Sequence, residues 1–218
     1  MRFGIHGRDF QQKSNRFIER LVDYLHRNRV EIWVSDKFLK QVKSPRIQSA
    51  KLKSFSLGQN LKGLDFFLSL GGDGTMLESV TYVNKAEVPI LGINTGRLGF
   101  LATTSREDSE KAIDNLLKGN FTTDPRTLLK LTSTPRLFDG LNFALNDFTI
   151  MKKDTSSMIT VHVYVDGELL NSYWSDGVIV STPTGSTGYS LSCGGPLVYP
   201  KSGSMIITAV SPHNLGTR

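Results

Sequence analysis

The sequence predicts an α/β domain with a parallel sheet, followed by a mainly antiparallel β domain of the sandwich type. Up to about residue 101, apolar runs of strand length alternate with segments of helical periodicity, a pattern typical of parallel sheets. Beyond that point, short alternating segments follow one another, separated by turns such as Asp139-Gly140 and Asp166-Gly167. We place the boundary near residues 101–106, which gives predicted domains of 1–103 and 104–218.

The first half contains the alternating strands and helices. Between Gln11 and Arg27, apolar residues from Phe17 to Leu25 recur with helical spacing. Continuous apolar runs such as Phe66-Phe67-Leu68 suit strands that are buried on both faces. In chain order we expect a strand at 2–6, a helix at 11–27, strands at 30–34 and 65–70, a helix at 75–84 and a strand at 88–93.

The second half contains one expected helix and a series of short strands. The helix covers Arg106 to Leu117, and the turn dipeptides between the later segments favour hairpins. Strands are expected at 128–132, 143–151, 159–165, 169–174, 177–181 and 204–210.

Composition excludes several classes of protein. With 39% hydrophobic and 21% charged residues the chain is ordinary for a globular domain, and it has no apolar run of about 18 residues. The N-terminus becomes polar too early for a signal peptide, so we expect a cytoplasmic protein with no membrane segment. Cys193 is the only cysteine, which excludes an intrachain disulfide and a cysteine zinc site.

The net charge of +6 is concentrated in the first half of the chain. Residues 1–100 carry 16 Lys+Arg and 9 Asp+Glu, a balance of +7, and much of it lies between Lys37 and Lys62. This run fits a solvated surface or, alternatively, attraction of a polyanionic nucleotide. No stacking aromatics are interleaved with the charges, so nucleic-acid binding is not expected.

The strongest chemical signal in the first half is Gly71-Gly72-Asp73-Gly74-Thr75, between an expected buried strand and a helix. Glycines let a backbone approach phosphate oxygens closely, and a helix N-terminus attracts anions. Asp73 fits this anion site as a general base beside a sugar hydroxyl, or it simply caps the helix. The turn lacks the lysine of a Walker A loop and is not Gly-x-Gly-x-x-Gly.

The Gly71–Thr75 segment resembles the signature shared by NAD kinases, diacylglycerol and sphingosine kinases and, more distantly, phosphofructokinases. This resemblance implies a Rossmann-like α/β domain of the diacylglycerol kinase and phosphofructokinase type. In those families the aspartate acts near the transferred phosphoryl group.

A second motif separates these families. Residues 182–192 read Thr-Pro-Thr-Gly-Ser-Thr-Gly-Tyr-Ser-Leu-Ser, which closely resembles the NAD kinase signature Thr-Pro-Thr-Gly-Ser-Thr-Ala-Tyr-Ser-Leu-Ser. Such a turn is also common on composition alone. Segments 94–101, Asn146-Asp147, Asp176-Gly177 and 211–213 are similar to the same family, of the bacterial ATP-NAD kinase type, in the right order.

The resemblance implies phosphorylation of the adenosine ribose 2'-hydroxyl of NAD by ATP, with Asp73 as the catalytic base. Asn146 and Asp147 would hold ribose hydroxyls, Asp176 would contact the nicotinamide end, and Phe100 would pack near the adenine. The residues implied to bind nucleotide are Gly71, Gly72, Asp73, Gly74, Thr75, Phe100, Asn146, Asp147, Asp176, Thr184, Thr187, Gly188, Tyr189, Ser190, Leu191 and Ser192.

Three positions depart from the family pattern. Asp147 stands where Glu is usual, Gly188 replaces the usual Ala, and Trp174 occupies a place that is often basic. Two alternatives stay open. A lipid kinase of the diacylglycerol type is favoured by the Gly71–Thr75 turn taken alone, and a nucleotide-binding module without catalysis is suggested by Asp147 and Gly188.

No cluster of histidines or carboxylates suggests a protein-bound metal, so we expect Mg²⁺ to be bound by the ATP phosphates. The expected partners are small nucleotides, and the family resemblance implies a homodimer or homotetramer. Family members continue beyond the point that corresponds to Arg218, so we expect unpaired strand edges and weak or absent turnover in this chain.

Overall fold

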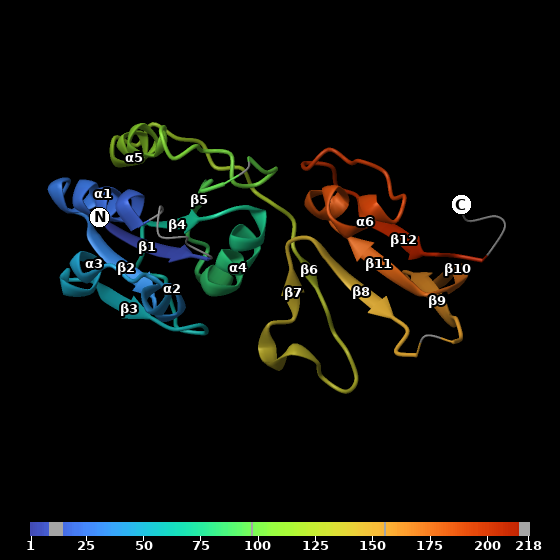
Figure 1. The fold of residues 1–218 in the computed structure, drawn as a ribbon. Coiled ribbons are helices and arrows are strands. Elements are labelled where there is room, and N and C mark those ends of the chain that lie inside the picture. The colour runs from blue at the N-terminus through green and yellow to red at the C-terminus, as the bar shows by residue number, and fades with distance from the viewer. Residues whose placement is uncertain (9–14, 97, 155, 214–218) are drawn as a thin grey trace. The chain divides into compact units, whose positions relative to one another are not determined.

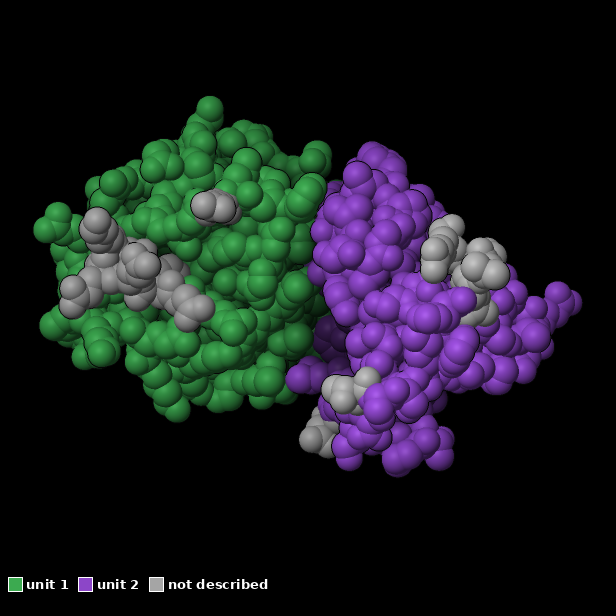
Figure 2. Space-filling model, turned by 45° about the vertical axis from the view of Figure 1, so that its right-hand side comes forward, with its two compact units in different colours: residues 1–123 green, residues 124–218 purple. Residues whose placement is uncertain are grey.

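The fold is seen in a computed structural model that describes residues 1–8, 15–96, 98–154 and 156–213. The chain forms two compact units, Met1–Thr123 (unit 1) and Asp124–Arg218 (unit 2), shown in different colours in Figure 2. Unit 1 is an α/β fold with a parallel sheet, and unit 2 is built from antiparallel sheets, as the sequence predicts.

Unit 1 extends past the boundary that the sequence suggests near residues 101–106, because helix α5 (Ser109–Leu117) packs against helix α1 (Asn15–Arg27). The Tyr24 hydroxyl donates a hydrogen bond to the Asp114 carboxylate, and Ile113 is fully buried in the same core. The helix therefore belongs with the sheet that precedes it.

The sheet of unit 1 has the strand order β3-β2-β1-β4-β5, and all its pairings are parallel (Figure 1). The apolar runs predicted from the sequence form its four longer strands. The strands are β1 (Arg2–Gly7), β2 (Glu31–Ser35), β3 (Lys53–Phe55), β4 (Phe66–Leu70) and β5 (Ile90–Ile93).

Two apolar cores lie on the two faces of this sheet. On one face, Ile18, Leu21, Val22 and Leu25 of α1 are buried against alternate strand residues. Their helical spacing is the one that the sequence predicts, although residues 11–14 of the expected helix lie outside the described residues. Helix α4 (Asp73–Val83) covers the other face through Tyr82 and Val83.

Three short elements of unit 1 were not predicted: β3 and the helices α2 (Asp36–Gln41) and α3 (Pro45–Ser49). Both helices are too short for a periodic signal, but each begins at a serine whose hydroxyl accepts a backbone N–H three residues later. Ser35 accepts from Phe38, and Ser44 accepts from Ile47. A short 3₁₀ turn, Asn84–Ala86, follows α4.

Unit 2 contains three small antiparallel sheets, ordered β12-β11-β8, β10-β9 and β6-β7. The strands are β6 (Leu129–Lys130), β7 (Phe143–Ala144), β8 (Asp147–Met151), β9 (Ile159–Val165), β10 (Glu168–Ser175), β11 (Gly177–Ser181) and β12 (Ile206–Val210). Helix α6 (Tyr189–Ser192) and the 3₁₀ turns Phe138–Gly140 and Thr184–Thr187 complete this unit.

The strand expected at 143–151 is divided into β7 and β8 by Leu145 and Asn146. The Asn146 carbonyl accepts the Thr182 N–H at 2.8 Å, and the Leu145 carbonyl accepts the Thr182 hydroxyl at 2.6 Å. These bonds tie the break to the end of β11, so Asn146 lies beside the loop that follows that strand. Across the described residues, no helix has the length and hydropathy needed to cross a bilayer.

Candidate active site

The glycine-rich turn lies at the carboxyl end of β4, where the strand order of the sheet reverses. Strand β1 has β2 on one side and β4 on the other, and chain connections run in opposite directions from this point. In open α/β sheets, ligands bind outside the carboxyl ends of the strands at such a switch point. The fold therefore places Gly71–Thr75 where a ligand is expected.

The glycines of this turn serve different purposes. Gly71 has φ +156°, and a Cβ there would lie 2.1 Å from the Thr75 hydroxyl oxygen, so the fold requires glycine. A Cβ at Gly72 or Gly74 would meet nothing within 4 Å, and both residues are exposed. No internal packing explains these two glycines, which leave the N-terminus of α4 open to an approaching anion.

Asp73 is the first residue of α4, but its carboxylate does not cap that helix. It accepts three backbone N–H groups from the segment after β5: Phe100 at 2.8 Å on Oδ2, and Leu101 at 2.9 Å and Ala102 at 3.1 Å on Oδ1. A Cβ at Gly99 would lie 2.3 Å from Oδ1, so this segment needs glycine to wrap around the carboxylate. Arg97 of the same segment lies outside the described residues.

The Asp73 carboxylate keeps capacity for one further hydrogen bond. A carboxylate offers about four lone-pair positions. The three amides occupy two positions on Oδ1 and one on Oδ2, so one position on Oδ2 remains for a hydroxyl donor. Phe100, next to this oxygen, is 69% exposed.

A buried polar row lies beneath α4, on the face of the sheet that this helix covers. His6 of β1 and Ser69 of β4 are direct partners in the sheet, and both are fully buried. His6 Nδ1 lies 2.6 Å from the Ser35 hydroxyl, whose oxygen already accepts the Phe38 N–H. Since that hydroxyl can still donate, we assign its proton to the bond with Nδ1, which leaves the histidine proton on Nε2.

The pKa of His6 is lowered from 6.5, first because burial disfavours the charged ring and further because Lys37 and Arg8 repel it; Glu78 opposes the shift. Above pH 6.5 the ring is neutral in both folded and unfolded chains. Below that pH the unfolded chain takes up the proton first, so the free energy of unfolding falls between pH 6.5 and the lower folded-state pKa.

We therefore expect acidification from pH 7 to pH 5 to destabilise the protein, with His6 contributing at most about 1.4 kcal/mol per pH unit, the slope of one proton. Urea unfolding at several pH values measures this. His6→Asn should flatten the dependence. The matched control is His162→Asn, because His162 Nδ1 also contacts a serine, Ser172 at 2.7 Å, but is exposed. Equal slopes in all three proteins would contradict the assignment.

In unit 2, the loop from Thr182 to Ser192 is built on internal hydrogen bonds. The Thr182 hydroxyl accepts the Gly185 N–H at 3.0 Å. A Cβ at Gly185 would lie 2.2 Å from the Asn146 carbonyl oxygen, so glycine is needed for this close approach. A Cβ at Gly188 would lie 3.3 Å from Asn146 Nδ2, which places that side chain beside the second half of the loop.

Tyr189 of unit 2 is influenced electrostatically by two other predicted site residues, Asp147 and Asp176. The pKa of Tyr189 is raised above 10.0, first by the Cys193 thiol and then by burial, with the negative charges of Asp147 and Asp176 adding to the effect. Buried Asn146 Oδ1 has no hydrogen-bond partner among the described residues. Unit 2 therefore holds the Asn146 amide beside Gly188 of the loop, with one buried amide oxygen unpaired among the described residues.

The remaining predicted residues of this loop differ in accessibility. Ser190 is fully buried, and its hydroxyl contacts that of Thr208 at 2.8 Å. Thr184 is also buried, and Thr187 donates to its carbonyl at 3.2 Å. Leu191 and Ser192 are exposed. Ser190 and Thr184 therefore support the loop, whereas the exposed positions are free to meet a ligand.

Two cations beside these residues were not predicted. Arg126 donates to the Thr184 hydroxyl at 3.3 Å and pairs with Asp124, and Lys152 pairs with Asp176 at 2.6 Å. Neither lies in a recognisable motif, so the sequence carries no signal for them. The ion pair with Lys152 partly neutralises the Asp176 carboxylate. At position 174, where the family often has a basic residue, this chain has an exposed tryptophan that packs edge-on against His213.

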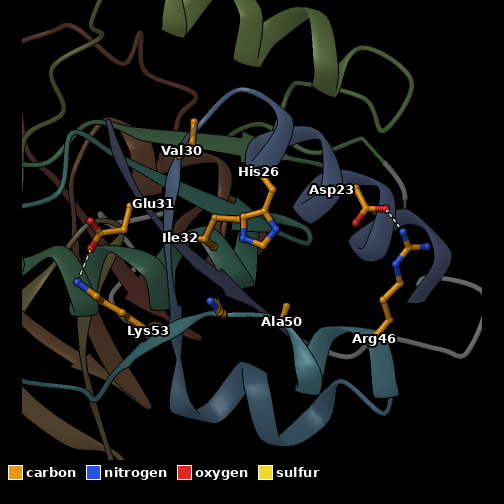
Figure 3. A pocket seen from close by; sticks show the side chains of 9 residues that line it. Asp23, His26, Val30, Glu31, Ile32, Arg46, Ala50 and Lys53 are labelled. Carbon is orange, nitrogen blue, oxygen red and sulfur yellow. Dashed lines mark ion pairs between the residues drawn. The ribbon is translucent and has the colours of Figure 1, made fainter.

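A surface cavity of about 590 Å³ lies at the opposite, amino end of the unit 1 strands (Figure 3). It is lined by apolar Val30 and Ile32 together with part of the basic run noted in the sequence. Two of its basic residues are neutralised within the cavity, where Arg46 pairs with Asp23 at 2.7 Å and Lys53 pairs with Glu31 at 2.8 Å. It contains none of the predicted site residues.

Comparison with known proteins agrees with this geometry. Residues 3–121 match the model of the ATP-NAD kinase N-terminal domain, and residues 145–218 match that of the C-terminal domain. Among curated relatives, the NAD kinases of Cytophaga hutchinsonii and Christiangramia forsetii are 50% and 42% identical, each over 100% of this chain and 75% of the relative.

Solved structures give the same family. Yeast NADH kinase complexed with NADH has a TM-score of 0.83 at 25% identity, over 100% of this chain and 67% of that one. The NAD kinase from Archaeoglobus fulgidus in complex with ATP has a TM-score of 0.71 at 28% identity, over 100% and 75%. The chain, with a carboxylate latched at the switch point of one unit and a hydroxyl-rich loop in the other, belongs to the NAD kinase family.

Proposed function

We propose that Asp73 accepts a hydrogen bond from the 2'-hydroxyl of the adenosine ribose of NAD while the γ-phosphoryl group is transferred from ATP to that hydroxyl. The hydroxyl oxygen bonds to the γ-phosphorus, the bond to the ADP leaving oxygen breaks, and the hydroxyl proton passes to Asp73. The products are NADP and ADP. The observation that carries this role is the carboxylate held by three amides with one acceptor position free.

The structure supports a role for Asp73 that is mainly positioning. Phosphoryl transfer has a loose transition state, so little covalent work falls to the protein. A carboxylate fixed by three backbone amides has little freedom to move, which suits it to orient a hydroxyl. Open Gly72 and Gly74 next to it leave room for phosphate oxygens at the N-terminus of α4.

We propose that unit 2 binds the dinucleotide through Asn146, Asp147, Asp176 and the Thr182–Ser192 loop. Asn146 Oδ1 is buried and has no hydrogen-bond partner among the described residues, which supports a contact with a ribose hydroxyl that reaches it. The Tyr189 ring, 43% exposed, offers an aromatic face to a ligand.

Magnesium is proposed to enter with ATP. Among the described residues, no group of three or more His, Cys, Asp or Glu side chains could hold a metal ion. Mg²⁺ commonly binds through substrate phosphates, whose charge it offsets during transfer. A homodimer or homotetramer in the cytoplasm remains our expectation, and light scattering of the purified chain measures its mass.

Incubation of the chain with Mg-ATP and either NAD or diacylglycerol tests the function. We expect whatever phosphate transfer the chain performs to go to NAD alone, detected as NADP by a dehydrogenase that is specific for it. Transfer to diacylglycerol would support the lipid kinase instead. NAD binding without transfer to either acceptor would favour the non-catalytic nucleotide-binding module.

A further inference from the structure

Helix α4 carries Asp73 at its first position, yet its first half has little apolar contact with the sheet. The buried residues of the helix are Thr75, Met76, Ser79, Tyr82 and Val83, and the large apolar cluster on this face includes only the last two. In the first half, Thr75 packs on Gly71, and Met76 packs on Gly92, where a Cβ would lie 2.5 Å from the methionine methyl. Hydrophobic burial therefore secures the end of α4 better than its beginning.

Glu78, the central residue of α4, links the helix to two other elements. One of its carboxylate oxygens accepts a hydrogen bond from the Lys37 ammonium of α2, at 2.5 Å. The other lies 3.4 Å from His6 Nε2 of β1, longer than an ordinary hydrogen bond. Glu78 Oε2 and His6 Nε2 are both buried, and neither has a hydrogen-bond partner among the described residues, so each depends on the other for polar contact.

The charges support this contact. Burial raises the pKa of Glu78, but Lys37 and His6 lower it by more than burial raises it, so the pKa lies below its ordinary value of 4.5. With the histidine proton assigned to Nε2, the ring presents an N–H to the carboxylate. Removing either partner leaves a buried polar atom uncompensated, which is costly.

We propose that Glu78 is a positioning residue for Asp73: held by Lys37 and facing His6, it fixes the first half of α4 on the sheet. Glu78 lies five residues after Asp73, which is about 7.5 Å along the helix axis. A shift of the helix there moves the Asp73 carboxylate relative to the amides of Phe100, Leu101 and Ala102. The inference rests on the proposed function of Asp73, since displacing that carboxylate is what would slow the reaction.

The first test is kinetic. Glu78→Ala should lower kcat by about tenfold, because small misplacements of a reacting group are costly, with the KM for ATP and NAD changed less than about twofold. Glu78→Gln should restore part of the loss, since its amide oxygen can still accept from His6 Nε2–H, while its NH2 group cannot accept from Lys37. The matched control is Glu110→Ala, which removes another helix glutamate in an ion pair, with Arg20 at 3.0 Å, and should leave kcat unchanged.

The second test does not require turnover. Amide hydrogen exchange of Phe100, Leu101 and Ala102 should be faster in Glu78→Ala by about tenfold, because their acceptor on Asp73 is less well held. Amides of the β9–β10 hairpin should not change. If Glu78→Ala does not fold, His6→Asn serves instead, because the shorter side chain can still reach Ser35 but not Glu78.

The kinetic and exchange results together test whether Glu78 positions Asp73. Slower turnover and faster exchange in Glu78→Ala, with partial recovery in Glu78→Gln, support the positioning role. Unchanged kcat and exchange in folded Glu78→Ala or His6→Asn would overturn it, while a large effect of Asp73→Asn in the same assay would leave the proposed function intact. If Asp73→Asn also has no effect, it is the function proposed for Asp73 that fails.

Discussion

Replacing Asp73 by asparagine is expected to lower kcat for NADP formation by about a thousandfold, within the range contributed by positioned acid–base groups. The substitution keeps the size of the side chain but turns one oxygen into an amide nitrogen, which cannot accept. If that nitrogen replaces Oδ1, the bonds from the Leu101 and Ala102 N–H groups are lost; if it replaces Oδ2, the bond from Phe100 and the position left for the ribose hydroxyl are lost together. Either orientation therefore removes at least one N–H···O bond, at a cost of about 1–3 kcal/mol in the free energy of unfolding.

Turnover is therefore reported per folded molecule, with the folded fraction taken from a urea titration of each variant. Asp36→Asn is the matched control, because Asp36 also occupies the first position of a helix in unit 1 and also accepts a hydrogen bond, from Ser56. It should retain the kcat of the parent chain. Equal activity of the Asp73 and Asp36 variants would mean that the latched carboxylate only holds the loop.

Gly185→Ala is expected to have the largest effect in unit 2. The added methyl would lie 2.2 Å from the Asn146 carbonyl oxygen and 2.6 Å from the Ser181 hydroxyl, so backbone must move. Overpacking of this kind costs about 1–3 kcal/mol in the free energy of unfolding. The movement also separates Asn146 from the loop, and we expect NAD affinity, measured by calorimetry, to fall about tenfold, which corresponds to 1.4 kcal/mol.

Gly188→Ala is the matched control in the same loop. Its methyl would lie 3.2 Å from the Gly185 carbonyl oxygen and 3.3 Å from Asn146 Nδ2, which small adjustments relieve. It also restores the alanine that the family signature carries. We expect NAD affinity and stability close to those of the parent chain, and a loss as large as that of Gly185→Ala would argue against a role for the Asn146 contact.

The long strands and helices of unit 1 could be predicted because each buries an apolar pattern. Helix α1 shows its buried face directly in the spacing from Ile18 to Leu25. Helices α2 and α3 were missed because five or six residues are too few for a period, and their serine caps act through local hydrogen bonds. The break in the strand at Asn146 was missed because its cause is Thr182, far along the chain.

The candidate site shows the same limit. The glycines and Asp73 could be found from residue type and order, since phosphate binding restricts which residues fit a turn. The partners of Asp73 could not, because they are backbone amides of Phe100, Leu101 and Ala102, which any residue except proline supplies. Of the two roles considered for Asp73, capping its own helix is wrong, since the carboxylate bonds to another segment, and the role in catalysis stays a prediction.

The most direct measurement of the central claim is the energetic coupling between Asp73 and the ribose hydroxyl. Binding of NAD and of an analogue without the adenosine 2'-hydroxyl is compared by calorimetry, in the parent chain and in Asp73→Asn, as a double-mutant cycle. If the free acceptor position on Asp73 holds that hydroxyl, the parent should prefer NAD by about tenfold, as expected for a hydrogen bond to a charged group. The variant should lose most of this preference. An equal preference in both proteins would show that the hydroxyl does not meet Asp73.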